Sequence, residues 1–314
     1  MSVTDLKFNK LITDTALGFL QDTSDFFATS AFPLVSSPDE YGSYPQYKLE
    51  DVLRTTMERV APGSAFKKVS RDLEWKTIEL YKHGVDVSIA DEKKKRISNA
   101  MQMEANISIV DAYRYIDKLT IDKVLADSIF DNTKTGNSDF TYLDDATSGD
   151  PIGVITEYVD YVGQTTGLPA DSILLTKDVH RKLRNHADII GRIGQNVGLR
   201  TASDAALAEL FGVQNVFVAK GVENTANKGN ATQTASYQAT NTILVYHRGV
   251  SAINAPGAAQ IIYCNDPIYG GNLINMLEGR DEDAECDILR TKGYFMPVVK
   301  ATCLGLKIKT VMTP

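Results

Sequence analysis

The sequence has little of the residues on which several protein classes depend. Among its 314 residues are only three cysteines, at positions 264, 286 and 303, and no two of them form a C-x-x-C pair. An odd, widely spaced set of this kind excludes a disulfide framework and a zinc knuckle, and it fits a reducing compartment. No stretch of ~18 apolar residues occurs, and charges interrupt the apolar stretches of the N-terminus, which excludes a membrane span and a secretory signal.

An excess of basic charge is also missing. The chain has 33 Lys and Arg against 40 Asp and Glu, a formal net charge of −7. A protein of this charge does not hold a polyanion tightly, so sequence-specific nucleic-acid binding is not expected. The one basic run, Lys93-Lys94-Lys95-Arg96, follows two acids at a predicted helix start and is interpreted as a solvated face.

Motifs for catalysis and metal binding are absent as well. The sequence contains no phosphate-binding glycine loop and no nucleophile elbow. The acids Asp281-Glu282-Asp283 are adjacent in a turn and cannot all point at one ion. We therefore predict no catalytic residue, no metal site, no cofactor and no enzyme; an α/β enzyme of the cytosol, with a site assembled around His180 and Asp178, is the alternative from another class. The sequence has four histidines, and none has a second metal ligand at a suitable spacing. They are His83, His180, His186 and His247.

What is present begins with an arm and a hairpin. Residues 1–45 are interpreted as an N-terminal arm with a short amphipathic helix, and a frayed terminus is the alternative. From Tyr47 to about Lys82, β-favouring residues on both sides of Ala61-Pro62-Gly63-Ser64 predict a long β-hairpin. Limbs of ~15 residues would reach ~50 Å at about 3.3 Å per residue, and an isolated two-stranded hairpin is marginal in water. We therefore expect it to lie on another subunit; two ordinary strands folded into a core are the alternative.

Trp75, the only tryptophan of the chain, lies in the second limb of this hairpin. It shares one face of the predicted strand with Leu73 and Thr77, while charged residues occupy the other face. A large aromatic side chain in this place is interpreted as an interface anchor, with a core tryptophan as the alternative.

A helical spine is predicted after the hairpin. The alternation of Val85, Val87 and Ile89 predicts a strand, and Asp91 is expected to cap a helical region. Apolar residues at helical spacing predict one helix from Met101 to Phe130, which would be ~45 Å long.

The next part of the chain has the capping signals of an α/β unit. Asp150 and Pro151 start a helix, and Ser172–Leu175 is a buried strand, after which Thr176 caps a second helix. A third helix follows Ser203 and ends at Gly212 before another strand. The C-terminal segment alternates in the manner of antiparallel strands.

This order, together with three phrases, resembles the major capsid proteins of tailed bacteriophages, which have the Hong Kong 97 fold. The phrases are SILLTKDVHRKLRNHADIIGRI at 172–193, LAELFGVQNVFVAKGVENTA at 207–226 and VAPGSAFKKVSRD at 60–72. The resemblance implies an α+β fold with an N-terminal arm over 1–45 and an extended loop over 46–84. It further implies a peripheral domain with a long spine helix, formed by 85–148 and 276–314, and an α/β axial domain over 149–275.

The function implied is structural. Copies of the chain would form pentamers and hexamers that close into an icosahedral shell, the virion capsid, assembled in the host cytoplasm around double-stranded DNA without sequence-specific binding. Implied partners are a scaffolding protein, a portal and a decoration protein, and no membrane. An encapsulin nanocompartment of the same fold is the close alternative. The expected intersubunit contacts are all on the extended loop: Pro62, Gly63, Lys67, Lys68, Arg71 and Trp75.

Overall fold

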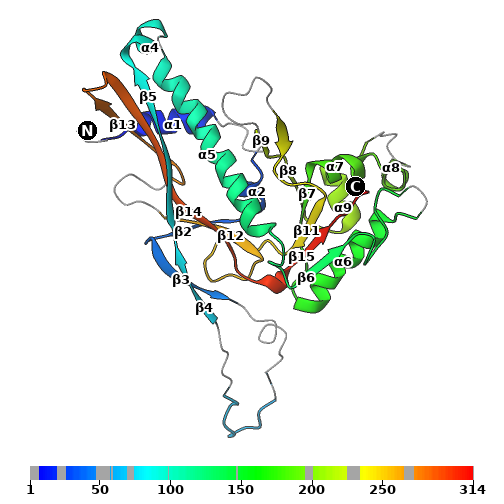
Figure 1. Cartoon of the computed structure of the whole chain (residues 1–314). Coiled ribbons are helices and arrows are strands. Elements are labelled where there is room, and N and C mark those ends of the chain that lie inside the picture. Colours follow the sequence, from blue (N-terminus) through cyan, green and yellow to red (C-terminus); the bar gives the residue numbers. More distant parts are fainter. Residues whose placement is uncertain are drawn as a thin grey trace.

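Two β-sheets and one long helix organise the chain in a computed structural model (Figure 1). The structure describes residues 7–19, 26–46, 57, 59–68, 74–97, 99–145, 148–194, 201–224, 234–264 and 272–313.

The larger sheet is built around one long strand, β14 (Cys286–Val299). The edge strand β5 (Tyr81–Ala90) pairs along one side of β14, while β13 (Asn275–Asp281) and β12 (Ala259–Cys264) pair along the other, all antiparallel. β2 (Leu34–Ser37) adds to β12 in parallel, and β1 (Lys7–Phe8) adds to β13. The predicted strand at 85–89 and the predicted C-terminal antiparallel strands are therefore confirmed.

The spine helix α5 (Ala100–Val124) packs across β14. It is 25 residues long, about 37 Å. Its buried side chains recur three and four residues apart, as an amphipathic helix requires. On this face lie Ala105, Ile109, Ile116, Asp117, Thr120 and Val124.

This helix ends six residues before the predicted Phe130, which corrects the sequence-based boundary. Leu125 lies at the C-cap, and Ser128 has a positive φ of 61°. The buried amine of Lys307 donates to the Leu125 carbonyl and forms an ion pair with Asp127 at 2.9 Å. A cation that binds the last carbonyls stabilises a helix end, so the tertiary fold stops the helix where the apolar pattern continues.

The N-terminal segment folds onto this spine. Helices α1 (Lys10–Phe19) and α2 (Ala28–Ala31) both contact α5. Ile12 and Ala16 of α1 are buried, whereas Leu11 is 76% exposed. The described parts of residues 1–45 are therefore packed against the chain and not frayed.

The second sheet has five strands in the order β6-β15-β11-β7-β8. Helices α6 (Pro151–Thr166), α7 (Lys177–Arg184), α8 (Ala187–Gly194) and α9 (Asp204–Phe211) accompany it. Alternate residues of β7 point into two different cores: Ile173 and Leu175 pack with these helices, and Leu174 packs in the core that contains α5. The strands are β6 (Asn132–Thr135), β7 (Ser172–Thr176), β8 (Asn215–Ala219), β11 (Thr242–Tyr246) and β15 (Gly305–Lys309).

Most predicted helix signals of this unit are confirmed. The Asp150 carboxylate accepts from the Gly153 N–H at 2.8 Å, and the hydroxyl of Ser203 accepts from the Ala206 N–H at 3.2 Å. Gly167 and Gly212 end their helices in the left-handed conformation. Thr176 lies at the predicted N-cap position of α7, but its hydroxyl forms no capping bond and donates to the Thr242 carbonyl across the sheet.

One predicted cap, Asp91, is wrong. In the short helix α4 (Asp91–Arg96), Ala90 occupies the N-cap position and Asp91 is the first helical residue. Its carboxylate binds the guanidinium of Arg280, with an Nη2–Oδ2 distance of 2.9 Å. The Asp91 carboxylate, which the sequence predicts to cap the helix, therefore binds Arg280 of β13 instead.

The domain boundaries stay a prediction, and both sheets draw strands from either side of them. β12 lies within 149–275 but pairs in the larger sheet, whereas β6 and β15 lie outside that range and pair in the five-stranded sheet. Three short elements complete the fold: β9 (Val222–Asn224), paired with β10 (Ala235–Tyr237), and the 3-10 turn η2 (Thr302–Leu304). None of the helices among these described residues is long and apolar enough to cross a membrane.

Candidate functional site

A hairpin leaves the body as two paired strands and extends away from both sheets (Figure 1). Its first strand precedes the predicted start at Tyr47 and lies almost entirely within the predicted arm, 1–45. Strand β3 (Tyr41–Gln46) pairs antiparallel with β4 (Glu74–Glu79). At the tip, the Ser64 N–H donates to the Ala61 carbonyl at 3.0 Å, and Gly63 has φ of 82°. The predicted turn at Pro62-Gly63 is therefore confirmed, because a positive φ at this position favours glycine.

The rest of the predicted hairpin is only partly visible. Residues 59–68 form no strand, and most of the first limb and residues 69–73, including Arg71, lie outside the described residues. Pro62, Gly63, Lys67 and Lys68 are all exposed at the tip. Two large apolar side chains are exposed there as well, Met57 at 94% and Phe66 at 82%.

The base of the hairpin has one covered face and one open face. Tyr44 and Ile78, on the inner face, are buried in a small cluster with Val35, Ile262 and Val298 of the larger sheet. The opposite face carries Trp75, which pairs in register with Pro45, and Tyr41, which pairs with Glu79. Trp75 is 60% exposed and Tyr41 is 68% exposed. We call the residues of this open face, Tyr41, Ser43, Trp75, Thr77 and Glu79, the root face.

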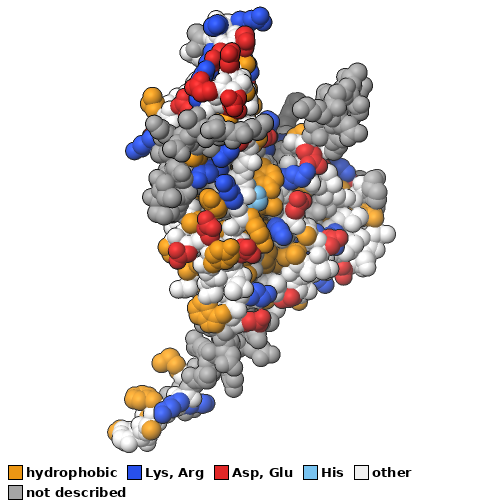
Figure 2. Space-filling view, turned by 60° about the vertical axis from the view of Figure 1, so that its left-hand side comes forward, with side chains coloured by type: hydrophobic (Ala, Val, Ile, Leu, Met, Phe, Trp, Pro, Cys, Tyr) orange, Lys and Arg blue, Asp and Glu red, His pale blue; other side chains and the backbone are white. Residues whose placement is uncertain are grey.

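The described residues therefore leave the root face open, with two large aromatic side chains, Trp75 and Tyr41, exposed on it. Figure 2 shows hydrophobic side chains on the surface just above the point where the hairpin leaves the body. Tyr81, the first residue of β5, adds a further aromatic ring that is 53% exposed. Exposed aromatic groups near one another on a sheet face mark interaction surfaces. Sequence reasoning found Trp75 but missed Tyr41 and Tyr81. The alternation of side chains along the strands on both sides of the hairpin could have predicted that these two residues point outward.

The basic run at the start of the spine forms ion pairs. Lys93 pairs with Glu104, and Lys94 pairs with both Asp91 and Asp287. Hydrogen bonds from Arg280 and Lys94 hold the pKa of Asp91 well below its usual range. Because carboxylates occupy part of the run, it does not offer the row of unpaired cations that a polyanion requires.

The residues of the alternative enzyme site have structural partners. His180 is buried, and its Nε2 lies 2.7 Å from an Asp204 oxygen, which joins α7 to α9. Burial lowers the pKa of His180, although the hydrogen bond that its ring forms to the Asp204 carboxylate opposes this shift. Asp178 accepts from the Asn241 N–H at 2.6 Å. Both side chains therefore form contacts within the fold, and within the described residues no group of His, Cys, Asp and Glu could hold a metal ion.

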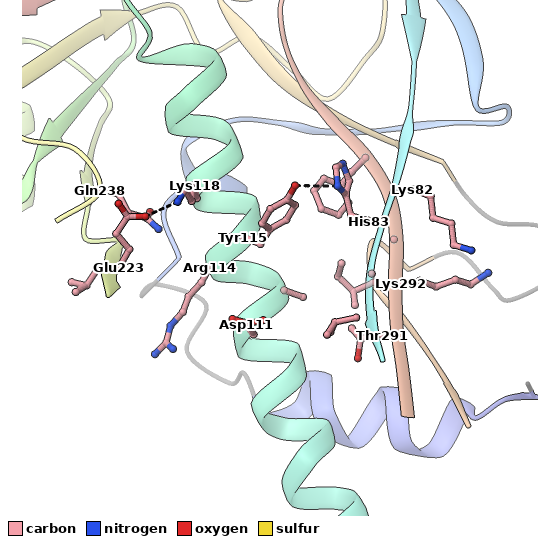
Figure 3. A pocket seen from close by; sticks show the side chains of 17 residues that line it. Lys82, His83, Asp111, Arg114, Tyr115, Lys118, Glu223, Gln238, Thr291 and Lys292 are labelled. Carbon is pink, nitrogen blue, oxygen red and sulfur yellow. Dashed lines mark hydrogen bonds and ion pairs between the residues drawn. The ribbon is translucent and has the colours of Figure 1, made fainter. Parts of the chain in front are cut away.

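A groove of about 730 Å³ lies elsewhere, between α5, the paired strands β5 and β14, and the β9–β10 hairpin (Figure 3). Its floor is an aromatic group: the ring centroids of His83 and Phe295 lie 4.7 Å apart, and those of His83 and Tyr115 lie 5.2 Å apart. The Tyr115 hydroxyl lies 3.2 Å from His83 Nδ1. No sequence motif marks this groove, because its residues come from six separate segments.

Comparisons with known proteins identify the fold. No family model and no curated protein matches the sequence. A phage-related protein from Bordetella bronchiseptica is similar in structure with a TM-score of 0.69 and 12% identity, over 99% of each chain. The capsid of the cyanophage P-SCSP1u is similar with a TM-score of 0.54 and 11% identity, over 100% of this chain and 91% of that chain. A virus-like particle from Pyrococcus furiosus gives a TM-score of 0.59 and 9% identity, over 94% of this chain and 98% of that chain.

At these identities the likeness establishes the fold. The chain has the Hong Kong 97-type capsid fold, with mixed helix and sheet, which confirms the predicted fold class.

Proposed function

We propose that the chain is the major capsid protein of a tailed bacteriophage, a structural protein and not an enzyme. Copies of it assemble as pentamers and hexamers into an icosahedral shell that encloses double-stranded DNA. The observation that carries this proposal is the root face, where the fold leaves Trp75 and Tyr41 exposed at the base of a hairpin that projects from its own subunit.

Physical reasoning connects this surface to assembly. A soluble monomer rarely exposes large side chains together, and burial of such groups against a partner is the main favourable term in association. Trp75 on β4 is exposed, and so are Met57 and Phe66, which lie between β3 and β4 in the sequence. A second copy of the chain is the partner that accounts for both the root face and the exposed loop residues, because every neighbour of a subunit in such a shell is another copy of the same chain. The contacts we propose are Pro62, Gly63, Lys67, Lys68, Arg71 and Trp75 on the extended loop 46–84.

The remaining assignments extend the same proposal. Residues 1–45 are the arm, 85–148 and 276–314 the peripheral domain, and 149–275 the axial domain. The net charge of −7 suits a container that admits packed DNA without gripping it. A scaffolding protein, a portal and a decoration protein are the further partners, and assembly takes place in the host cytoplasm before the chain resides in the virion capsid.

Electron microscopy of the expressed protein tests the proposal. We expect closed icosahedral shells or capsomers, and particles isolated from the producing cell should contain double-stranded DNA. Shells that contain a cargo enzyme and no genome would assign the chain to an encapsulin nanocompartment instead. A monomer at every concentration, with scaffolding protein supplied, would contradict the shell-forming function itself.

A further inference from the structure

The groove between α5 and β5 contains buried polar atoms that lack a partner within the described part of the chain. They are His83 Nε2, Thr291 Oγ1 and Gln238 Oε1. Thr291 is only 2% exposed, so its hydroxyl is buried at the wall of the groove. A buried polar group without a hydrogen bond costs about 1–3 kcal/mol, and a ligand that supplies the bond recovers this cost. The three atoms therefore favour an occupant with both donors and acceptors.

The groove also follows an open strand edge. Four consecutive residues of β5, from Lys82 to Val85, line it. Successive side chains of a strand point to opposite faces, so a groove lined by consecutive residues borders the backbone of β5 as well as its side chains. β5 pairs with β14 on one side, and no other strand within the described ranges pairs with its second side. Unpaired backbone groups along such an edge are a template for an added strand.

The charged side chains that line the groove indicate which kind of peptide strand it would bind. Lys82 and Arg114 are exposed and lie on opposite sides of the groove (Figure 3). Lys118 and Glu223 neutralise one another, with an Nζ–Oε2 distance of 2.7 Å. Asp111 is the other carboxylate of the lining, so cationic side chains exceed anionic ones. This mixture suits side-chain carboxylates spaced along a peptide, whereas the carboxylates among the cations oppose a continuous polyphosphate.

We propose that this groove binds an extended, acidic segment of a separate protein, which adds as a strand to the free edge of β5. Its backbone pairs with Lys82–Val85, its carboxylates reach Lys82 and Arg114, and its polar groups bond the unpartnered atoms of His83 and Thr291. This site goes beyond shell formation, because it needs only one subunit and a second kind of chain.

The test uses the full-length chain and a fluorescein-labelled, end-capped hexapeptide of alternating glutamate and valine, followed by fluorescence anisotropy. We expect saturable binding that Arg114→Glu weakens at least ~10-fold and Thr291→Val weakens several-fold. Arg96→Glu, the same charge change at an exposed position of α4, is the matched control and should leave binding unchanged. N-methylation of one alternate set of peptide residues should abolish binding and N-methylation of the other set should not, because an added strand presents only alternate N–H groups to β5.

Two competitors identify the occupant. The lysine–valine counterpart of the peptide should not bind, and a twelve-residue oligothymidine should not displace the glutamate–valine peptide. The proposal is overturned by any of four results: no saturation up to about 1 mM peptide, equal binding to Arg114→Glu, insensitivity to both N-methylated peptides, or displacement by the oligonucleotide, which would assign the groove to nucleic acid. Each result is independent of whether the chain forms shells.

Discussion

The carboxylate of Asp117, buried on the spine helix α5, accepts a hydrogen bond from the backbone N–H of Ala28 at 3.0 Å. Asp117 is 2% exposed, and it holds the helical turn α2 of the N-terminal segment against the C-terminal half of the spine. Burial raises the pKa of Asp117 to about 7, although hydrogen bonds from Ala28 and Phe27 oppose this shift. The attachment of the N-terminal segment therefore depends on a group that titrates near neutral pH.

This contact predicts a pH dependence of stability. Because the pKa of Asp117 is higher in the folded chain than its ordinary value of 3.8, the folded state binds the proton more tightly. The free energy of unfolding should therefore fall as the pH rises from about 4 to about 7. Asp117→Asn keeps an acceptor oxygen without the charge, so the wild type should lose roughly 2–4 kcal/mol relative to this variant between pH 4 and pH 8. Urea unfolding at both pH values measures the difference, and parallel pH profiles would show that Asp117 does not titrate in this range.

The core of the helical layer beside the five-stranded sheet predicts a second result. Leu183 of α7 is fully buried in the cluster that also contains Ile173 and Phe211. Leu183→Ala should lower the free energy of unfolding by roughly 2–5 kcal/mol, because the cavity cannot close completely. Leu210→Ala is the control, since Leu210 is only half-buried and its loss should cost about 1 kcal/mol. Equal unfolding midpoints for the two variants and the wild type would place the core elsewhere.

Trp75 provides a direct optical report of association, because it is the only tryptophan and is 60% exposed in the subunit. Its emission should be that of a solvated indole in the unassembled chain, and acrylamide should quench it. Assembly should shift the emission to shorter wavelength and protect it from quenching. Trp75→Ala should weaken association by at least ~2 kcal/mol and Trp75→Phe by less. Identical emission and quenching before and after assembly would remove Trp75 from the interface.

The fold could be predicted from sequence where local chemistry decides it. Asp150, Gly167 and Gly212 mark helix ends because their capping and left-handed geometry depend on few distant contacts. Predictions failed where distant residues intervene. Lys307, on a C-terminal strand, caps α5 at Leu125, and Arg280 takes the carboxylate of Asp91. No pattern near either helix end contains these partners.

Some features of the candidate site could also be predicted from the sequence, and others depend on contacts between distant residues. Trp75 and the turn at Pro62-Gly63 are visible in the sequence as a rare residue and a breaker. The exposure of Trp75 depends on which face of β4 the larger sheet covers, and that choice is made by Ile78 packing against Val35 and Val298. The groove could not be predicted, because His83, Tyr115 and Thr291 meet only after three separate elements have packed.

We expect the extended loop to join neighbouring subunits and to contribute little to the stability of its own subunit. Gln46 and Glu74 face one another in the β3–β4 register. A short Gly-Ser turn in place of Lys48 to Arg71 therefore removes the projection and keeps both paired strands of the root face. This matched pair of chains, with and without the projection, separates assembly from folding.

Light scattering of the two chains, under conditions in which the unmodified protein assembles, tests this claim most directly. We predict that the shortened chain stays folded and soluble, with a nearly unchanged thermal midpoint, and scatters only as a small species while the unmodified chain forms shells. Shells of normal size and yield from the shortened chain would contradict the role of the loop, and a shortened chain that unfolds would show that the loop belongs to the core of its own subunit.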